Sequence, residues 1–220
     1  AEVVQDVPAV INAVNAEALA DLNVRDFTDV QTIVPGLSLA ANPNGVGSVS
    51  SMRGVNFDVN VSGNSATVEY YYNDSPIVSN AVLQAMYDIS QIEVLRGPQG
   101  TLRGRASPSG AINITSRKPD LFGAGGYVNG TLTSLDGHNL NGAMNIPVVE
   151  GKLAVRLAGL ISNDEGNRVR PYGDKDAELR NRTRSGRISV SADPFDGLLL
   201  LDFNYQTLDK SSLQYSQVRS

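Results

Sequence analysis

Apolar and polar residues alternate along much of the second half of the chain. In the segment Lys152–Ser162, Leu, Val, Gly and Ile at odd positions alternate with Lys, Ala, Arg and Leu at even ones. A period of two places successive side chains on opposite faces of a β-strand. Segments of this kind come close to the roughly 9–11 residues of a tilted membrane strand. The pattern predicts five strands, at Gly126–Ser134, Leu140–Ile146, Lys152–Ser162, Arg184–Ala192 and, less regularly, Leu198–Leu208.

The connections between these strands differ in length. Pro147–Gly151 and Asp193–Gly197 are expected to be tight turns, whereas Asn163–Thr183 is long and charged. Short turns at one end of the strands and long polar loops at the other are typical of outer-membrane barrels. A soluble antiparallel sheet with one apolar face gives the same alternation, so the pattern alone favours neither interpretation.

The first half follows a different pattern, in which short strands and short helices mix. Asn15 is expected to cap a helix over Ala16–Leu22. Asp26 and Asp29 resemble a capping box that opens a second helix, which must end before Pro35. Strands are predicted at Ala9–Val14, Ser48–Gly54, Thr67–Tyr72, Gln91–Gly97 and Ala111–Ser116. The fold class of this half is therefore α+β.

Composition excludes several classes of protein. The chain carries 18 Lys+Arg against 23 Asp+Glu, a net charge of -5, so general attraction to nucleic acid is not expected. The tyrosines of Tyr70–Tyr72 should alternate between strand faces and cannot form one stacking platform for bases. No cysteine is present, which rules out disulfides and thiolate chemistry within this chain. The most apolar run, Gly197–Phe203, is far shorter than the roughly 18 residues of a membrane-spanning helix.

No arrangement of residues predicts catalysis. The one histidine, His138, falls in an expected turn, and no carboxylate or histidine set has metal-ligand spacing. Asp174–Asp176 lacks the following ligands of a calcium loop. We therefore predict no catalytic residue, no metal and no cofactor.

The stretch "IEVLRGPQGTLRGRASPSGAINITSRK", from Ile92 to Lys118, joins two short strands by a loop rich in glycine. Ile92 and Val94 should point into a small core, and Arg96 should leave the end of the first strand. Glycine permits backbone conformations that a Cβ atom disfavours, and proline stiffens the chain. The residues expected to shape the loop are Gly97, Pro98, Gly100, Gly104 and Gly110.

The segment "QIEVLRGPQGTLRGRASPSGAINITSRKP" resembles the plug-domain signature of TonB-dependent outer-membrane receptors. "QDVPAVINAVNAEALADLNVRDFTDVQTIVPGL", "SMRGV" and "VEYYYNDSPI" precede it in the order that is usual for the plug. The chain departs from the family at Arg103, where an aromatic residue is usual. The resemblance implies a plug domain at residues 1–120, followed at 121–220 by the first five strands of a transmembrane barrel. Five strands cannot close a barrel in lipid, and plugged barrels have about 22, so the remaining strands should lie outside this chain.

The resemblance also implies roles for single residues. Arg53 and Arg96 are similar to the plug arginines that pair with glutamates of the barrel wall. We group Glu93 with them as a plug-anchoring residue. We expect it to bond to partners inside the plug and not to act as a catalytic acid. The residues expected at the substrate-facing tips of the plug are Asn44, Phe57, Asp58 and Asn80.

By resemblance, the function is TonB-energised uptake of a scarce nutrient across the outer membrane of a Gram-negative bacterium, gated by the plug. The nutrient could be a siderophore-iron complex, cobalamin or an oligosaccharide. The expected partners are outer-membrane lipid, the remaining barrel and TonB with ExbB and ExbD, bound through a box upstream of Ala1; the resemblance also allows a surface lipoprotein. A receptor that mainly signals, and a soluble β-rich binding module, remain as alternatives.

Overall fold

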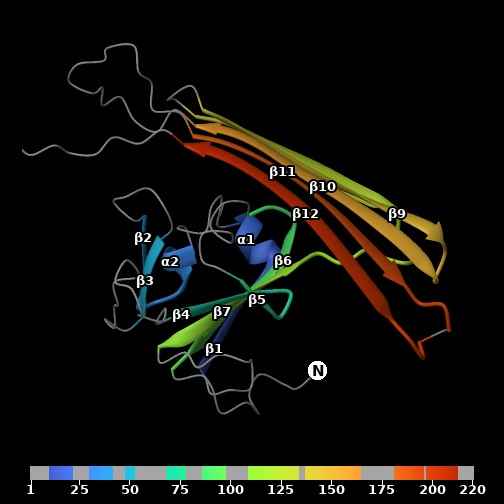
Figure 1. Ribbon diagram of the computed structural model, residues 1–220, viewed down its shortest axis with the longest axis horizontal. Helices are drawn as coiled ribbons and strands as arrows, with labels where there is room; N and C mark the ends of the chain where they lie inside the picture. Colours follow the sequence, from blue (N-terminus) through green and yellow to red (C-terminus); the bar gives the residue numbers. More distant parts are fainter. Residues whose placement is uncertain are drawn as a thin grey trace, which may run out of the picture. The chain divides into compact units, whose positions relative to one another are not determined.

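The structure is a computed structural model of the chain. It describes residues 10–21, 30–41, 48–52, 68–77, 86–97, 109–133, 137–164, 181–195 and 197–212. The chain divides into two compact units, Ala1–Ser116 and Arg117–Ser220. Figure 1 follows both from blue at the N-terminus to red near the C-terminus.

The first unit is built around a five-stranded sheet. Its strands are β1 (Val10–Asn15), β4 (Val68–Tyr72), β5 (Ser75–Ile77), β6 (Ile89–Arg96) and β7 (Gly110–Ser116). Their spatial order is β1-β6-β7-β4-β5, with β4 and β7 parallel and the other pairs antiparallel. A separate antiparallel pair is formed by β2 (Leu37–Ala41) and β3 (Ser48–Met52), and the helices are α1 (Ala16–Asp21) and α2 (Val30–Ile33). The predicted α+β class of this unit is therefore confirmed.

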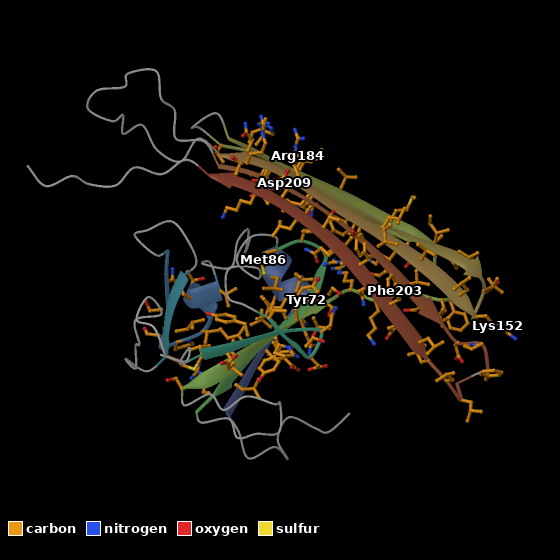
Figure 2. All side chains as sticks on the ribbon, viewed as in Figure 1. Tyr72, Met86, Lys152, Arg184, Phe203 and Asp209 are labelled. Carbon is orange, nitrogen blue, oxygen red and sulfur yellow. The ribbon has the colours of Figure 1, made fainter. Side chains whose placement is uncertain are left out.

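One face of this sheet carries the core of the first unit. Ile92 and Val94 are fully buried in it, as the alternation along β6 predicts. Tyr72 and Met86, both labelled in Figure 2, pack against the same cluster. Tyr71 belongs to a smaller buried cluster apart from this core. The neighbouring tyrosines thus alternate between faces and offer no continuous stacking surface.

Local capping explains where the helices begin and end. The Asn15 side-chain oxygen accepts the backbone N–H of Ala18 at 2.9 Å, which is the predicted N-cap of α1. Helix α2 ends at Ile33, before Pro35, and Gly36 then adopts a φ of 84° that favours glycine. The predicted capping pair Asp26 and Asp29 lies outside the described residues.

The second unit is a five-stranded antiparallel sheet. Its strands are β8 (Gly125–Leu132), β9 (His138–Val149), β10 (Leu153–Asp164), β11 (Asn181–Ala192) and β12 (Leu201–Ser212), each paired with its neighbours in chain order. β10 and β11 are in register over 12 residue pairs, from Leu153↔Ala192 to Asp164↔Asn181. All five strands predicted from the alternation are present.

Several sequence-based boundaries were wrong. Pro147–Val149, predicted as part of a turn, continues β9, because a register shift at Leu153 and Ala154 accommodates the proline. His138 begins β9 and does not lie in a turn. Leu198–Leu200 precede β12. Strands β2 and β5 were not predicted, and Pro76 is tolerated because β5 is an edge strand.

The predicted tight turn at Pro147–Gly151 is found at one end of the second sheet, whereas the predicted long loop Asn163–Thr183 lies mostly outside the described residues. The β9–β10 turn is tight, with Lys152 donating its backbone N–H to Val149 O at 2.9 Å and Gly151 at a φ of 71°. Figure 2 shows Lys152 at this end of the strands, and Arg184 and Asp209, a register pair on β11 and β12, toward the other. None of the described helices is long and apolar enough to span a membrane.

Candidate functional site

The two faces of the second sheet have opposite composition. We call one of them the apolar face; on it Met144 is 51% exposed and Phe203, labelled in Figure 2, is 62% exposed. Its exposed large side chains are Val128, Leu132, Leu140, Met144, Ile146, Val148, Leu157, Ile161, Ile188, Leu201, Phe203 and Tyr205. Soluble monomers rarely expose so continuous an apolar surface.

The opposite face, here the polar face, is the better buried one. On β11, Arg187 and Ser189 are only 2% and 1% exposed. Ser189 Oγ donates to Asn204 Oδ1 of β12 at 2.5 Å, so polar groups pair across the strands. The polar face also carries Asn129, Asn145, Arg156, Ser191 and Asp202.

This arrangement decides between the two interpretations that the alternation leaves open. A soluble sheet buries its apolar face and exposes its polar one. In this sheet large apolar side chains are exposed while arginines and serines are buried. An outward apolar band with an inward polar face is the pattern of strands that line a membrane barrel.

A short segment at the start of the second unit is held on the polar face. We call Arg117–Gly123 the connector. Asn145 Nδ2 of β9 donates to Asp120 O at 2.9 Å and to Gly123 O at 2.5 Å, and Asn145 Oδ1 accepts the Asp120 N–H at 2.9 Å. Because Asn145 is 4% exposed, these bonds satisfy a buried amide that would otherwise be costly.

Two further contacts fix the start of the connector. Lys118 Nζ lies 2.5 Å from Asp202 Oδ2 on β12, and Ser191 Oγ donates to Asp202 Oδ1 at 2.5 Å. The Arg117 guanidinium carbon lies 5.8 Å from the ring centroid of Tyr127 on β8, within cation–π range. The connector is therefore tied to β8, β9 and β12.

Within the first unit, a polar network surrounds Asn113 of β7, which is 2% exposed. Asn113 Nδ2 donates to Asp74 Oδ1 at 3.0 Å and to Glu93 Oε2 at 3.2 Å, and Asn113 Oδ1 accepts the Asp74 N–H at 3.3 Å. Gln91 donates to the other oxygen of Glu93 at 2.8 Å. Glu93 is thus bound by partners inside its own unit.

The network includes the β4–β5 turn. Asn73 and Asp74 have φ values of 49° and 63°, as a two-residue type I′ hairpin turn requires. Asn73 Oδ1 accepts the backbone N–H of Ser116 at 2.9 Å, and its amide donates to Ser116 Oγ at 3.1 Å. The turn is therefore attached to the last residue of β7, next to the connector.

Arg96 ends β6 with a half-buried side chain. Its Nε is buried and has no hydrogen-bond partner among the residues that the structure describes. The next residue, Gly97, has a φ of +96° and donates its N–H to Ser109 O at 3.1 Å. Gly110, at the start of β7, lies so close to Leu95 that a Cβ atom there would be 2.4 Å from the Leu95 carbonyl oxygen.

The other predicted site residues cannot be placed. They lie outside the described residues: Asn44, Arg53, Phe57, Asp58, Asn80, Pro98, Gly100, Arg103 and Gly104. Of the predicted anchoring and loop residues, the structure describes Glu93, Arg96, Gly97 and Gly110. It places Gly97 directly after β6, Gly110 at the start of β7 and Glu93 in the Asn113 network.

Sequence reasoning missed the residues that hold the connector. The sequence pattern identifies Asn145 and Asp202 as polar positions in alternating strands and places Lys118 at the end of the plug motif. A partial signal exists for Asn145 and Asp202, because each is a strongly polar side chain near the tight-turn end of its strand. In the described part of the chain, no three His, Cys, Asp or Glu residues gather in a way that could hold a metal ion.

The comparisons agree with this geometry. Residues 3–111 match the model of the TonB-dependent Receptor Plug Domain. The chain therefore belongs to the TonB-dependent receptors, with a plug in its first unit and antiparallel barrel strands in its second. Among relatives, the pesticin receptor of Yersinia pestis is 30% identical over 183 residues, which cover 83% of this chain and 27% of that protein.

Two other likenesses extend over both units. The iron-regulated outer membrane virulence protein of Vibrio cholerae is 29% identical, over 88% of this chain and 30% of that protein. The crystal structure of the ferric yersiniabactin uptake receptor FyuA from Yersinia pestis matches with a TM-score of 0.81 and 28% identity, over 90% of this chain and 31% of that one. The chain thus spans less than a third of the length of these relatives, and its predicted location in the outer membrane is confirmed by them.

Proposed function

We propose that this chain is the plug-bearing part of an outer-membrane receptor that imports a ferric siderophore with energy delivered through TonB. One observation carries the proposal: a plug-domain sequence at residues 3–111 continues into a sheet whose apolar face is exposed and whose polar face is buried. That combination suits a polar stopper inside a lipid-facing wall. It does not suit a soluble binding module or an enzyme.

The choice of an iron chelate draws on the relatives. One is titled a ferric yersiniabactin uptake receptor, and another, in Escherichia coli, is named the catecholate siderophore receptor Fiu, 28% identical over 120 residues. Cobalamin and oligosaccharides are the competing substrates. The plug-tip residues Asn44, Phe57, Asp58 and Asn80 are proposed to face the substrate.

The sheet order of the plug supports a gating route. Among the described strands, β1 is an edge strand that pairs with β6, and the pair nearest to its N-terminal end is Val10↔Arg96. A pull from TonB, with ExbB and ExbD, through a box upstream of Ala1 would load this pair first. Edge strands with few contacts open at a lower free-energy cost than central ones.

Anchoring of the plug is proposed for Arg53 and Arg96, each paired with a carboxylate of the barrel wall. The buried Arg96 Nε without a partner among the described residues is consistent with such a contact, because buried polar groups are normally bonded. Glu93 acts within the plug by accepting from Gln91 and Asn113. Gly97, Pro98, Gly100, Gly104 and Gly110 shape the loop between β6 and β7.

Transport by the full-length receptor in its host tests the proposal. A deletion strain should lose uptake of one class of radioiron-labelled siderophore, and the gene on a plasmid should restore it only when TonB is present. Cobalamin, labelled oligosaccharides and siderophores of other classes serve as parallel substrates. Restored uptake of cobalamin or an oligosaccharide without iron uptake would refute the ferric-siderophore assignment, and a transcriptional response without any uptake would favour a signalling receptor.

A further inference from the structure

The connector is bound across the whole width of the second sheet. Arg117 contacts Tyr127 on β8, and the next residue, Lys118, pairs with Asp202 on β12. These strands are the two edges of the order β12-β11-β10-β9-β8. Two adjacent residues thus reach opposite edges of one sheet, and Asn145 of β9 holds the backbone that follows.

We infer that the connector is a fixed anchor, and that plug rearrangement during uptake occurs N-terminal to Arg117 while Arg117–Gly123 stays on the barrel wall. Asn145, Lys118 and Asp202 are the positioning residues of this anchor. The inference rests on the proposed uptake function, and it adds which end of the plug stays in place.

Asn145 provides the strongest part of the anchor. Its side chain uses both amide hydrogens and its oxygen on the backbone of Asp120 and Gly123. Aspartate has the same shape but lacks the two donors, and alanine lacks all three interactions. Since Asn145 is buried, opening the connector would leave a buried amide without partners.

The ion pair between Lys118 and Asp202 positions the connector more than it stabilises it. Lys118 is 63% exposed at its side chain, and exposed ion pairs contribute little on their own. Asp202 is 25% exposed and is also bonded by Ser191, so its carboxylate is held in place. The pair therefore fixes where the connector begins, whereas Asn145 resists its release.

The connector follows the plug sheet directly in the sequence, and the order of that sheet indicates which end of the plug opens first. The connector follows Ser116, the last residue of β7, and β7 is the central strand of the order β1-β6-β7-β4-β5. β1, which comes first in the chain, lies at an edge. A force applied through the N-terminus therefore meets an edge strand, while the anchored end follows a strand that is paired on both sides.

Reversible cross-linking tests the inference in the full-length receptor in cells. The chain has no cysteine, so Lys118→Cys and Asp202→Cys can be bridged selectively by a short bifunctional methanethiosulfonate, which a reductant removes. We expect the rate of TonB-dependent radioiron uptake to change by no more than about twofold on bridging. A fall of about tenfold or more that is reversed by reductant would overturn the inference, because it would show that the connector must leave the wall.

A second measurement does not depend on the cysteine variants. Trypsin added to spheroplasts should leave the Arg117–Lys118 bond of the wild-type receptor intact, both at rest and during transport. Cleavage that appears only while TonB is energised and substrate is present would overturn the inference. Failure of the proposed function is distinguishable, since the wild-type receptor would then show no TonB-dependent uptake in any of these samples.

Discussion

A Cβ atom placed on Gly110 would lie 2.4 Å from the carbonyl oxygen of Leu95, which is closer than non-bonded atoms approach. Met52 Sδ would be 2.7 Å away, so two neighbours block the same position. The φ of Gly110, +150°, also disfavours other residues. The beginning of β7 can therefore pack against β6 and Met52 only with glycine at this position.

We expect Gly110→Ala to destabilise the plug by about 2 kcal/mol or more, because both the backbone and its neighbours must move. Differential scanning calorimetry of the detergent-solubilised receptor would measure the loss. Gly97→Ala is the matched control: it has a positive φ but nothing within 4 Å, so it should cost only about 1–2 kcal/mol. Equal losses for the two variants would contradict the packing argument.

Asn113→Ala should also destabilise the plug, by about 1–3 kcal/mol, because it removes a buried amide that joins Asp74 to Glu93. Hydrogen exchange should increase at the β4–β5 turn before it increases elsewhere. Glu93→Gln, which keeps an oxygen that can accept from Asn113, should have the smaller effect. A turn that stays protected in Asn113→Ala would refute the role of this network.

The exposed apolar face leads to an expectation opposite to that for a soluble sheet. Leu157→Lys should lower the stability of the folded barrel in lipid by about 2–4 kcal/mol if its position is near the bilayer midplane. Heat-modifiable migration of the receptor after outer-membrane extraction would report the loss of folded protein. Asn129→Lys, on the polar face of β8, is the control and should fold normally; tolerance of both lysines would argue against a lipid-facing surface.

Release of the connector should be visible by proteolysis. Asn145→Asp keeps the side-chain shape but removes the two donors to Asp120 O and Gly123 O, so trypsin should cut after Arg117 faster than in the wild type. Asn141→Ala is the matched control, because Asn141 lies on the same face of β9 and, among the described residues, its amide donates to Asn139 two positions away. Unchanged cleavage in Asn145→Asp would show that the connector is held by other contacts.

Because β1 lies at an edge of the plug sheet, we expect it to separate from β6 during uptake. Ala13 and Glu93 are register partners in the antiparallel β1–β6 pair, and such partners lie about 4.5–5.5 Å apart at Cα, which suits a disulfide. Oxidised Ala13→Cys/Glu93→Cys should lose most TonB-dependent uptake and regain it on reduction. Full uptake in the oxidised form would exclude peeling of β1 as the opening step.

The alternation of apolar and polar residues was enough to predict the strands of the second unit. It located β10 and β11 because their pattern is regular from end to end. It ended β9 too early at Pro147, since a single sequence gives no sign of the register shift that accommodates this residue. Pro76 likewise argued against a strand at Ser75–Ile77. The sheet order shows that β5 is an edge strand, where proline is tolerated.

The site was harder to predict than the fold. Residues that bond to a nearby backbone group, such as the helix cap Asn15, were identifiable because their partners are close in sequence. Asn113 bonds to residues 20 and 39 positions away, and Lys118 pairs with a residue 84 positions away. No periodic pattern encodes such contacts, and only the folded sheets bring these residues together.

Among the described residues, the partners of the connector lie on β8, β9 and β12 and in the β9–β10 turn, where the Gly151 N–H donates to Leu121 O at 3.0 Å. These contacts need none of the barrel strands that lie outside this chain, so pairing of β8–β12 is enough to seat the connector.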